Sequence, residues 1–360
     1  MSTLFKDLYN RGYLEQLSLE IKKNYSAFDD KAYILEVLDD TYEEKELKQR
    51  MRHISTTLGL FLEGSFSDSI KILKKTFINM DTDLTLQNMI FQDFVEVYGL
   101  EEVDISLEAL AVFTVGSSSE FAIRRFIIKD TKTTMNRMLL WAQSDNEHLR
   151  RLASEGCRPR LPWAIALEEY KNDPSDVLEV LDLLKDDESV YVRKSVANNI
   201  NDISKDNPKI VIELTKKWIG FSKNRDKLLK HGCRTLLKAM DSEVLGLFGL
   251  EKATHIRIKD VCIQDDVKLG EELEFSFVIE SEKSIGALRI EYQMGFLRKN
   301  GSHSKKMFKI SESNFDMKIK KVIKKHSFRP ISTRVYYEGM QKVNIVLNGE
   351  IVKELVFNLS

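Results

Sequence analysis

A short pattern of residues recurs in the middle of the chain at an interval that few folds allow. Residues 145–151 (DNEHLRR) are echoed by residues 188–194 (ESVYVRK), so that an apolar residue followed by two cations returns 43 residues later. Units of this length each hold a pair of helices and cannot bury an apolar face alone, which makes neighbouring units stack. The interval therefore predicts a row of stacked helical pairs.

Apolar residues up to about residue 250 recur at helical spacing. Asp173-Pro174 and Asn207-Pro208 each put a capping side chain before a proline at the expected first helical position, and Gly220 is an expected helix end. Weaker echoes of the repeat lie near Arg124 and Lys230. We therefore expect a HEAT-like helical-repeat solenoid over residues 1–250. Two stripes carry the helical spacing: Val177, Val180, Leu181 and Leu184, then Ile210, Val211, Leu214 and Trp218.

The pattern changes near residue 255. Apolar and polar residues alternate from Leu273 to Glu280, which is the period of a half-buried strand. Asn348-Gly349 is a typical two-residue hairpin turn between two further apolar runs. Strands at such short spacing predict a C-terminal immunoglobulin-like β-sandwich over residues 255–360. The expected class is thus mostly α, a helical solenoid followed by this sandwich.

Composition and missing motifs exclude several functions. The chain has 42% hydrophobic and 31% charged residues, as a globular protein does, and no apolar run near the roughly 20 residues that cross a bilayer. The first residues lack the layout of a signal peptide, so we expect a cytoplasmic protein without a membrane partner. Cys157, Cys233 and Cys262 form no metal-binding spacing, and no glycine-rich phosphate loop occurs. We expect no metal, nucleotide or other cofactor.

The net charge of −1 conceals an uneven distribution. Residues 1–118 carry −9, whereas residues 119–238 and 255–360 each carry +5. Cations that recur in stacked repeats would form a basic face able to contact phosphates, although any single pair is equally explained as solvated surface charge. The sandwich lysines have a similar alternative as protectors of an edge strand. The predicted DNA-binding residues are Arg124, Arg150, Arg151, Arg158, Arg160, Arg193, Lys194, Lys230, Lys305 and Lys306.

Residues 154–163 (SEGCRPRLPW) hold the densest set of reactive groups. Two prolines and a glycine predict a loop after the preceding helix, and loops on a rigid scaffold often carry function. The segment presents one carboxylate, two guanidiniums and an indole. On the residues alone, the structural alternative is that Glu155 pairs with a nearby arginine and Trp163 belongs to the core.

Three segments together resemble the AlkC branch of the AlkC/AlkD superfamily of DNA alkylation-repair glycosylases. They are Glu120–Arg124, Glu155–Trp163 and Val192–Asp206. The likeness covers about residues 1–250, and the tail is similar to the immunoglobulin-like domain found in part of that branch. Arg125 departs from the pattern, because relatives often carry proline there.

The resemblance implies base excision repair. It implies hydrolysis of the N-glycosidic bond of cationic bases, chiefly 3-methyladenine and 3-methylcytosine, in double-stranded DNA, by a monofunctional enzyme without a deep base-flipping pocket. Glu120, Glu155 and Asp202 match the acidic site positions, and Trp163 matches the aromatic residue beside the lesion sugar. Carboxylates can stabilise oxocarbenium character on that sugar. We also expect a monomer, associated with the nucleoid when DNA is bound.

Two other functions remain open at this point. A catalytically silent member of the same repeat family would recognise bent or branched DNA. A HEAT-type scaffold for protein partners would use the acidic first third instead. Acids among phosphate-binding cations favour the enzyme, because carboxylates in a DNA groove oppose binding.

Overall fold

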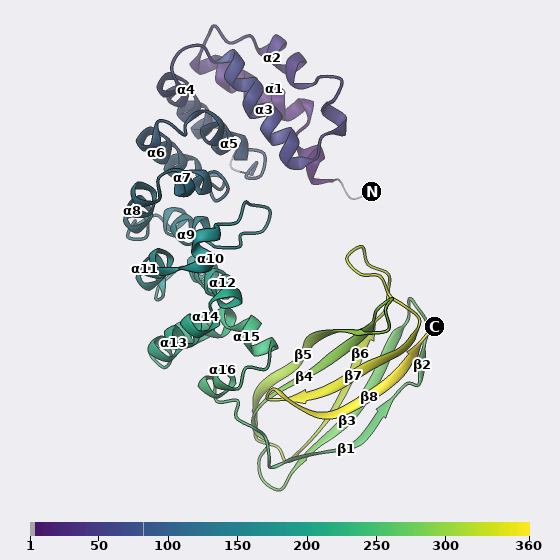
Figure 1. The fold of residues 1–360 in the computed structure, drawn as a ribbon. Helices are drawn as coiled ribbons and strands as arrows, with labels where there is room; N and C mark the ends of the chain where they lie inside the picture. The colour runs from purple at the N-terminus through teal and green to yellow at the C-terminus, as the bar shows by residue number, and fades with distance from the viewer. Residues whose placement is uncertain (1–3, 82) are drawn as a thin grey trace. The chain divides into compact units, whose positions relative to one another are not determined.

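The structure is a computed structural model that describes residues 4–81 and 83–360. Helices fill the chain up to Leu247 and strands follow from Ile256, which confirms the predicted fold class (Figure 1). Within the described residues, no helix is long and apolar enough to cross a membrane. The helices are α1 (Arg11–Asn24), α2 (Asp30–Val37), α3 (Leu47–Phe61), α4 (Phe66–Asn79), α5 (Met89–Tyr98), α6 (Val103–Phe113), α7 (Ile123–Lys129), α8 (Thr131–Trp141), α9 (Glu147–Gly156), α10 (Glu168–Asn172), α11 (Ser175–Leu184), α12 (Val190–Asp206), α13 (Pro208–Trp218), α14 (Lys223–Gly232), α15 (Arg234–Lys238) and α16 (Ser242–Leu247), with short 3-10 turns η1 (Phe5–Leu8) and η2 (Tyr42–Glu44).

The chain divides into two compact units. The helical unit comprises Met1–Asn207 with Lys223–Leu228, and the C-terminal unit comprises Pro208–Ser222 with Leu229–Ser360. The last helices thus group with the strands, whereas the change from helix to strand lies between Leu247 and Ile256. The domain bounds expected from the sequence, 1–250 and 255–360, stay a prediction.

In the helical unit, successive helices stack in chain order (Figure 1). α9 packs against α8, α11 and α12. The predicted stripe on α11 is buried in full, and Pro208 begins α13 as expected. The Asp173 carboxylate accepts the Ser175 N–H, as a capping side chain does, and α11 begins at Ser175, one residue after the expected start at Pro174. The predicted stripe on α13 is wrong, because the buried face is Val211, Ile212, Thr215 and Trp218.

The recurring arginine of the 43-residue repeat closes a turn. The Arg150 guanidinium donates to the carbonyls of Ser144 and Asp145, both at 2.9 Å. Arg193 makes the same bonds one repeat later, to the carbonyls of Asp187 and Glu188. Arg150 also binds the Asp187 carboxylate, with Nε 2.6 Å from Oδ2, and thereby joins one repeat to the next. The repeated arginine therefore has a structural role, in which it bonds the turn before its own helix, and Arg150 also bonds the next repeat.

The C-terminal unit contains a sandwich of two sheets, ordered β1-β3-β6 and β2-β8-β7-β4-β5. Its core is apolar side chains from both sheets, such as Phe275 and Phe277 of β3 and Ile290 of β4. The predicted hairpin joins β7 to β8, and Asn348 and Gly349 both have positive φ, as the tight turn requires. The strands are β1 (Ile256–Ile263), β2 (Asp266–Val267), β3 (Glu272–Ser281), β4 (Gly286–Leu297), β5 (His303–Phe315), β6 (Ile319–Ser327), β7 (Gly339–Leu347) and β8 (Glu350–Leu359).

Gly156, the last residue of α9, allows the close approach of three helices. A Cβ at this position would lie 2.7 Å from Ile123 Cγ2 of α7 and 2.9 Å from Met138 Cε of α8. We expect Gly156→Ala to lower the free energy of unfolding by about 1–3 kcal/mol, because a packed interior must shift to admit a methyl group. Urea unfolding followed by circular dichroism measures this. An unchanged midpoint would contradict the tight packing around α9, and Gly246→Ala, where nothing lies within 4 Å, is the control.

Candidate functional site

Six charged side chains of alternating sign form a continuous chain of ion pairs, which we call the ion-pair ladder. Its members are Glu120, Arg151, Glu155, Arg158, Asp202 and Lys205. They come from the segment before α7, from α9, from the loop after α9 and from α12, and the contact widest in sequence joins Arg158 to Asp202. The formal charges cancel within the ladder.

The contacts are short and mostly buried. Arg151 Nη1 lies 2.5 Å from Glu120 Oε2, and its Nη2 lies 3.6 Å from Glu155 Oε1. Arg158 is shared by two acids, with Nη1 2.6 Å from Glu155 Oε1 and Nε 2.8 Å from Asp202 Oδ2. The side-chain exposure falls from 16% at Glu120 to 7% at Glu155 and 2% at Asp202. Glu120 is therefore the most accessible of the three acids.

Neutral hydrogen bonds complete the surroundings of the acids. Ser195 Oγ donates to Glu155 Oε2 at 2.6 Å, and Ser118 Oγ donates to Glu120 Oε2 at 3.0 Å. Ser195 binds the Glu155 oxygen that the arginines leave open, whereas Ser118 and Arg151 share Oε2 of Glu120. Burying a charge is tolerable only when such partners exist. Arg158, whose Nε and Nη1 both bond carboxylates, has its pKa raised by Glu155 and Asp202 against the opposing effect of burial.

The side chain of Arg124 holds the two sides of the loop after α9 together. This side chain is 0% exposed, and its guanidinium donates to three backbone carbonyls: Ile165 at 2.7 Å, Gly156 at 3.0 Å and Arg158 at 2.7 Å. Burial lowers the pKa of Arg124 to about 10. A loop that leaves a helix end has unpaired carbonyls, and a guanidinium with five N–H groups can bind several of them at once.

Trp163 lies at the tip of this loop. Its indole is 69% exposed, and its φ of 64° is in the left-handed region that bulky side chains seldom adopt. The core alternative for Trp163 is wrong, because the side chain faces solvent. An exposed aromatic residue held in an uncommon backbone conformation is a marker of a functional position.

The structural alternative for Glu155 describes its contacts well, since it does pair with Arg158 and Arg151. The predicted acids Glu120, Glu155 and Asp202 are brought together in one ladder. Trp163 extends from the same loop as Arg158. The sequence thus grouped these residues correctly in space, and their chemical roles are taken up below as a proposal.

The predicted DNA-binding cations separate into three groups. Arg124 has no exposed surface to offer a phosphate, so the prediction that it contacts DNA does not fit its burial. A larger group is already bonded within the protein. Lys194 of α12 and Lys305 and Lys306 of β5 are exposed. The bonded group is Arg150 with Asp187, Arg151 and Arg158 in the ladder, Arg160 with Asp206, Arg193 with backbone carbonyls, and Lys230 with Glu312.

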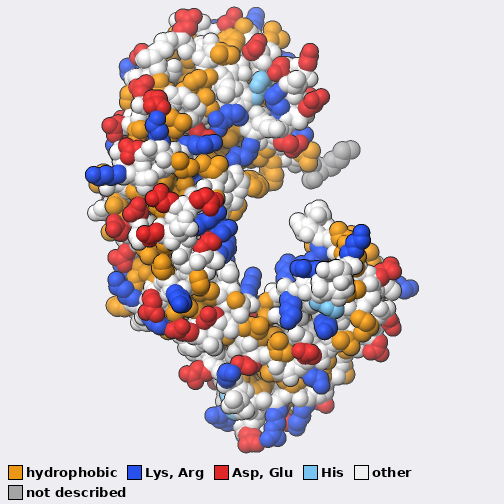
Figure 2. Space-filling model, in the orientation of Figure 1, with side chains coloured by type: hydrophobic (Ala, Val, Ile, Leu, Met, Phe, Trp, Pro, Cys, Tyr) orange, Lys and Arg blue, Asp and Glu red, His pale blue; other side chains and the backbone are white. Residues whose placement is uncertain are grey.

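Oppositely charged side chains are therefore mixed over the helical unit, as the space-filling view shows (Figure 2). Sequence reasoning missed Ser195, the carboxylate partner on α12, and Tyr191, whose ring lies 5.2 Å from the Arg151 guanidinium and is 43% exposed. Tyr191 falls inside the echoed 43-residue pattern, which was the one available signal for it.

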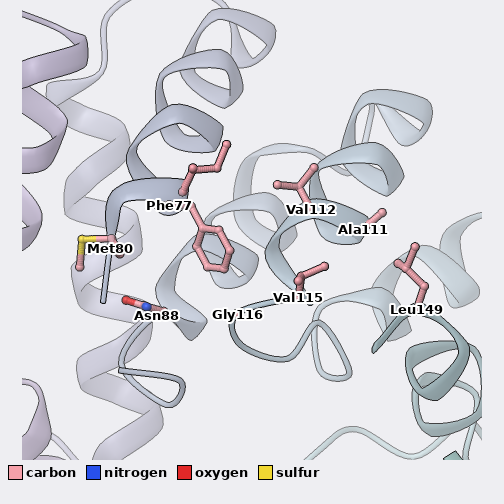
Figure 3. Close-up of a pocket in the computed structure, with 9 residues that line it drawn as sticks. Phe77, Met80, Asn88, Ala111, Val112, Val115, Gly116 and Leu149 are labelled. Carbon is pink, nitrogen blue, oxygen red and sulfur yellow. The ribbon is translucent and has the colours of Figure 1, made fainter. Parts of the chain in front are cut away.

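Neither a metal centre nor the main apolar hollow of the helical unit offers an alternative site. Within residues 4–81 and 83–360, no group of three or more His, Cys, Asp or Glu side chains is arranged to hold a metal ion. The hollow, of about 530 Å³, lies among α4, α6 and α9 and is lined by Phe77, Val112, Val115 and Leu149 (Figure 3). Its lining contains no titratable side chain, so it can supply no acid or base.

Comparisons with known proteins identify the families that the two parts of the chain resemble. A profile of the family described as DNA alkylation repair enzyme matches residues 113–229, which include the whole ladder. A profile described as the C-terminal Ig-like domain of uncharacterised protein YhaZ matches residues 257–360.

Two relatives match along nearly their full length. Uncharacterized protein YhaZ of Bacillus subtilis (strain 168) is 38% identical over 98% of this chain and 99% of its own. The solved structure of Pseudomonas fluorescens alkylpurine DNA glycosylase AlkC, bound to DNA containing an abasic site analog, is 31% identical. It covers 99% of this chain and 100% of that chain, with a TM-score of 0.93.

The burial of Arg124 predicts a structural effect of its removal. Arg124→Met leaves three carbonyls without their donor, of which those of Gly156 and Arg158 are buried, and we expect the free energy of unfolding to fall by about 3 kcal/mol or more. The control is Arg125→Met, one residue along, because that side chain is 50% exposed and its contact to Glu96 is 3.7 Å long. Equal urea midpoints of the two variants would contradict this account of the loop.

Proposed function

The chain belongs to the DNA alkylation repair enzymes, in the AlkC branch of the AlkC/AlkD superfamily, and on this premise we propose that it is a DNA glycosylase that excises cationic alkylated bases. The observation that carries the proposal is the ion-pair ladder. It places Glu120 and Glu155 together in the segment that matches the repair-enzyme family, beside a loop that presents an exposed indole.

The proposed substrates are double-stranded DNA with 3-methyladenine or 3-methylcytosine. A base that already carries a positive charge becomes neutral when the C1′–N bond breaks and the bond electrons pass to it. It therefore needs no general acid. The sugar is left with oxocarbenium character, which a nearby carboxylate stabilises. Water then bonds to C1′ and loses a proton, which yields the free base and an abasic site.

We assign the roles by exposure. Glu120 is the most accessible acid and faces the sugar, while Glu155 adds negative potential from behind it. Asp202 is nearly inaccessible and binds Arg158 and Lys205, so it acts by holding the ladder in place. Trp163 lies against the lesion sugar, where the electron-rich face of an indole attracts developing positive charge. In this mechanism the base needs no deep pocket, unlike in glycosylases that extrude it fully.

The cations of the ladder are consistent with the roles assigned to its acids. Arg151 contacts both Glu120 and Glu155, and so keeps two like charges close together that would otherwise repel. Because its own charge is balanced, the ladder attracts phosphates weakly. Affinity for the duplex then comes from cations outside it, of which we propose Lys194, Lys305 and Lys306. We expect a monomer that acts in the cytoplasm, without a cofactor, on the nucleoid.

The test of the enzyme is incubation of methylated duplex DNA with the pure protein, followed by chromatography of the released bases. We expect Glu155→Gln and Glu120→Gln each to slow single-turnover release of 3-methyladenine by about 10²–10³-fold, the typical loss when one electrostatic contact to a transition state is removed. DNA binding should change little. The matched control is Glu147→Gln, on the same helix α9 but in its first turn.

The outcomes separate the competing functions. If the wild type releases 3-methyladenine and both glutamine variants release it at the same rate, the site assignment is wrong. DNA binding without release of any base would indicate the silent, structure-selective member of the family. Absence of salt-sensitive DNA binding would indicate a scaffold for protein partners.

The exposed cations give a separate prediction. Lys194→Met should weaken binding to methylated and unmethylated duplexes equally, and should reduce the slope of log Kd against log salt by about 0.9. The Lys305→Met, Lys306→Met double variant should reduce it by about twice as much. Fluorescence titrations at several salt concentrations measure both. Lys71→Met on α4, which removes a lysine paired with Asp68, is expected to leave the slope unchanged, and an equal fall there would refute the assignment.

A further inference from the structure

The loop after α9 is anchored at its base, and its tip is a turn. Arg124 binds the carbonyls of Gly156, Arg158 and Ile165, and the Leu167 N–H donates to the Pro159 carbonyl at 3.1 Å. The loop tip, residues 162–164, projects beyond these bonds and is closed by the Ala164 N–H, which donates to the Leu161 carbonyl at 3.3 Å. Since Trp163 is 69% exposed, its own side chain contributes little packing to hold the tip.

A cavity lies beneath the tip. It has a volume of about 190 Å³ and is bounded by Ala164 and Ile165 of the loop on one side. The other walls come from α3, α5 and the start of α7, and they include Lys48, Asp93 and Phe121. Atoms that border a void have no neighbours on that side and gain no packing energy there. Packing across this cavity therefore does little to hold the tip against α3, and a bond is needed to do so.

Lys48 of α3 supplies that bond. Its Nζ donates to the Trp163 carbonyl at 2.6 Å and lies 4.2 Å from the centroid of the Phe121 ring. Among residues 4–81 and 83–360, Lys48 is the one side chain that hydrogen-bonds the backbone of the loop tip. Phe121 directly follows Glu120, the most accessible acid of the ladder. One ammonium group thus joins the indole-bearing loop to the segment that carries this acid.

The backbone conformation of Trp163 explains what the bond from Lys48 controls. Trp163 is the third residue of the turn that starts at Leu161, after Pro162 in second place, and a φ of 64° is usual at this position of such a turn. The turn thus sets the backbone conformation of Trp163, and the bond from Lys48 fixes where the turn lies relative to α3. A shift of the turn carries the indole with it, because the side chain and the carbonyl are attached to the same Cα.

We propose that Lys48 is a positioning residue that fixes Trp163 in the orientation used at the lesion. The inference rests on the proposed glycosylase function. The proposal gives the acidic first third of the chain, residues 1–118, a role at the site. Neither the negative charge of this segment nor its distance in sequence from the ladder indicates such a role. Lys48 acts through the Trp163 carbonyl and the Phe121 ring and does not touch the reacting atoms.

The first test compares chemistry with binding. Lys48→Met should slow single-turnover release of 3-methyladenine about 10- to 100-fold, since small displacements of a positioned group have effects of this size. The Kd for DNA should stay within about threefold, because one exposed cation contributes modestly to a salt-dependent affinity. Lys48→Arg, which keeps a long cationic donor, should recover most of the rate. Lys71→Met removes a lysine from the helical unit elsewhere and should match the wild type.

The second test asks whether Lys48 works through Trp163. Trp163→Ala alone should slow release, and adding Lys48→Met to it should cause no further loss, because the group that Lys48 positions is already absent. Multiplied losses in the double variant would mean that Lys48 acts independently and would overturn the proposal. Full activity of Lys48→Met would do so as well.

A third measurement does not depend on catalysis. The emission of Trp163 is obtained as the difference between proteins with and without Trp163→Phe, in both the wild-type and the Lys48→Met backgrounds. We expect its fluorescence anisotropy to fall in Lys48→Met, since an untethered indole moves faster. If the wild type releases no base, the proposed function fails while the anisotropy still decides whether Lys48 orients Trp163. Unchanged anisotropy would overturn the proposal whatever the activity.

Discussion

The buried guanidinium of Arg124 is the interaction on which the site region depends. It lies where α9 ends and a proline-rich loop departs, and it binds carbonyls from both sides of that loop. A helix end leaves carbonyls that need donors, and the contacts of Arg124 to Gly156 and Arg158 are buried. By binding them, Arg124 brings the two sides of the loop together. Arg158 can then extend into the ladder while Trp163 projects to solvent.

The ion-pair ladder shows how carboxylates can be kept in a region that we propose contacts DNA. Three acids near a polyanion would oppose binding, but each is paired with a cation inside the protein. The paired charges cost little at long range, because their fields nearly cancel beyond a few ångströms. At contact distance the outermost carboxylate still presents its negative oxygen. A site of this kind discriminates between a distant phosphate and an adjacent cationic sugar.

Much of the fold could be predicted from the sequence. The apolar stripe of α11, the start of α13 at Pro208 and the hairpin at Asn348-Gly349 all follow from local rules of spacing and turn geometry. The same rules misjudged the α13 face and placed the start of α11 one residue early, although Asp173 does accept the Ser175 N–H as a capping side chain. Local signals thus determine which elements form, while tertiary packing determines which face of a helix is buried.

The sequence by itself also singled out the candidate site residues. The likeness of three segments to a repair family pointed to Glu120, Glu155, Trp163 and Asp202, and all four lie within the matched residues 113–229. Only the tertiary structure decided what each cation does. Arg124, Arg150 and Arg193 look like phosphate-binding residues in a linear pattern, yet their guanidiniums bind backbone carbonyls. A charge in a sequence carries no direction, whereas its partner depends on which way a helix face turns and on which carbonyls the fold leaves without donors.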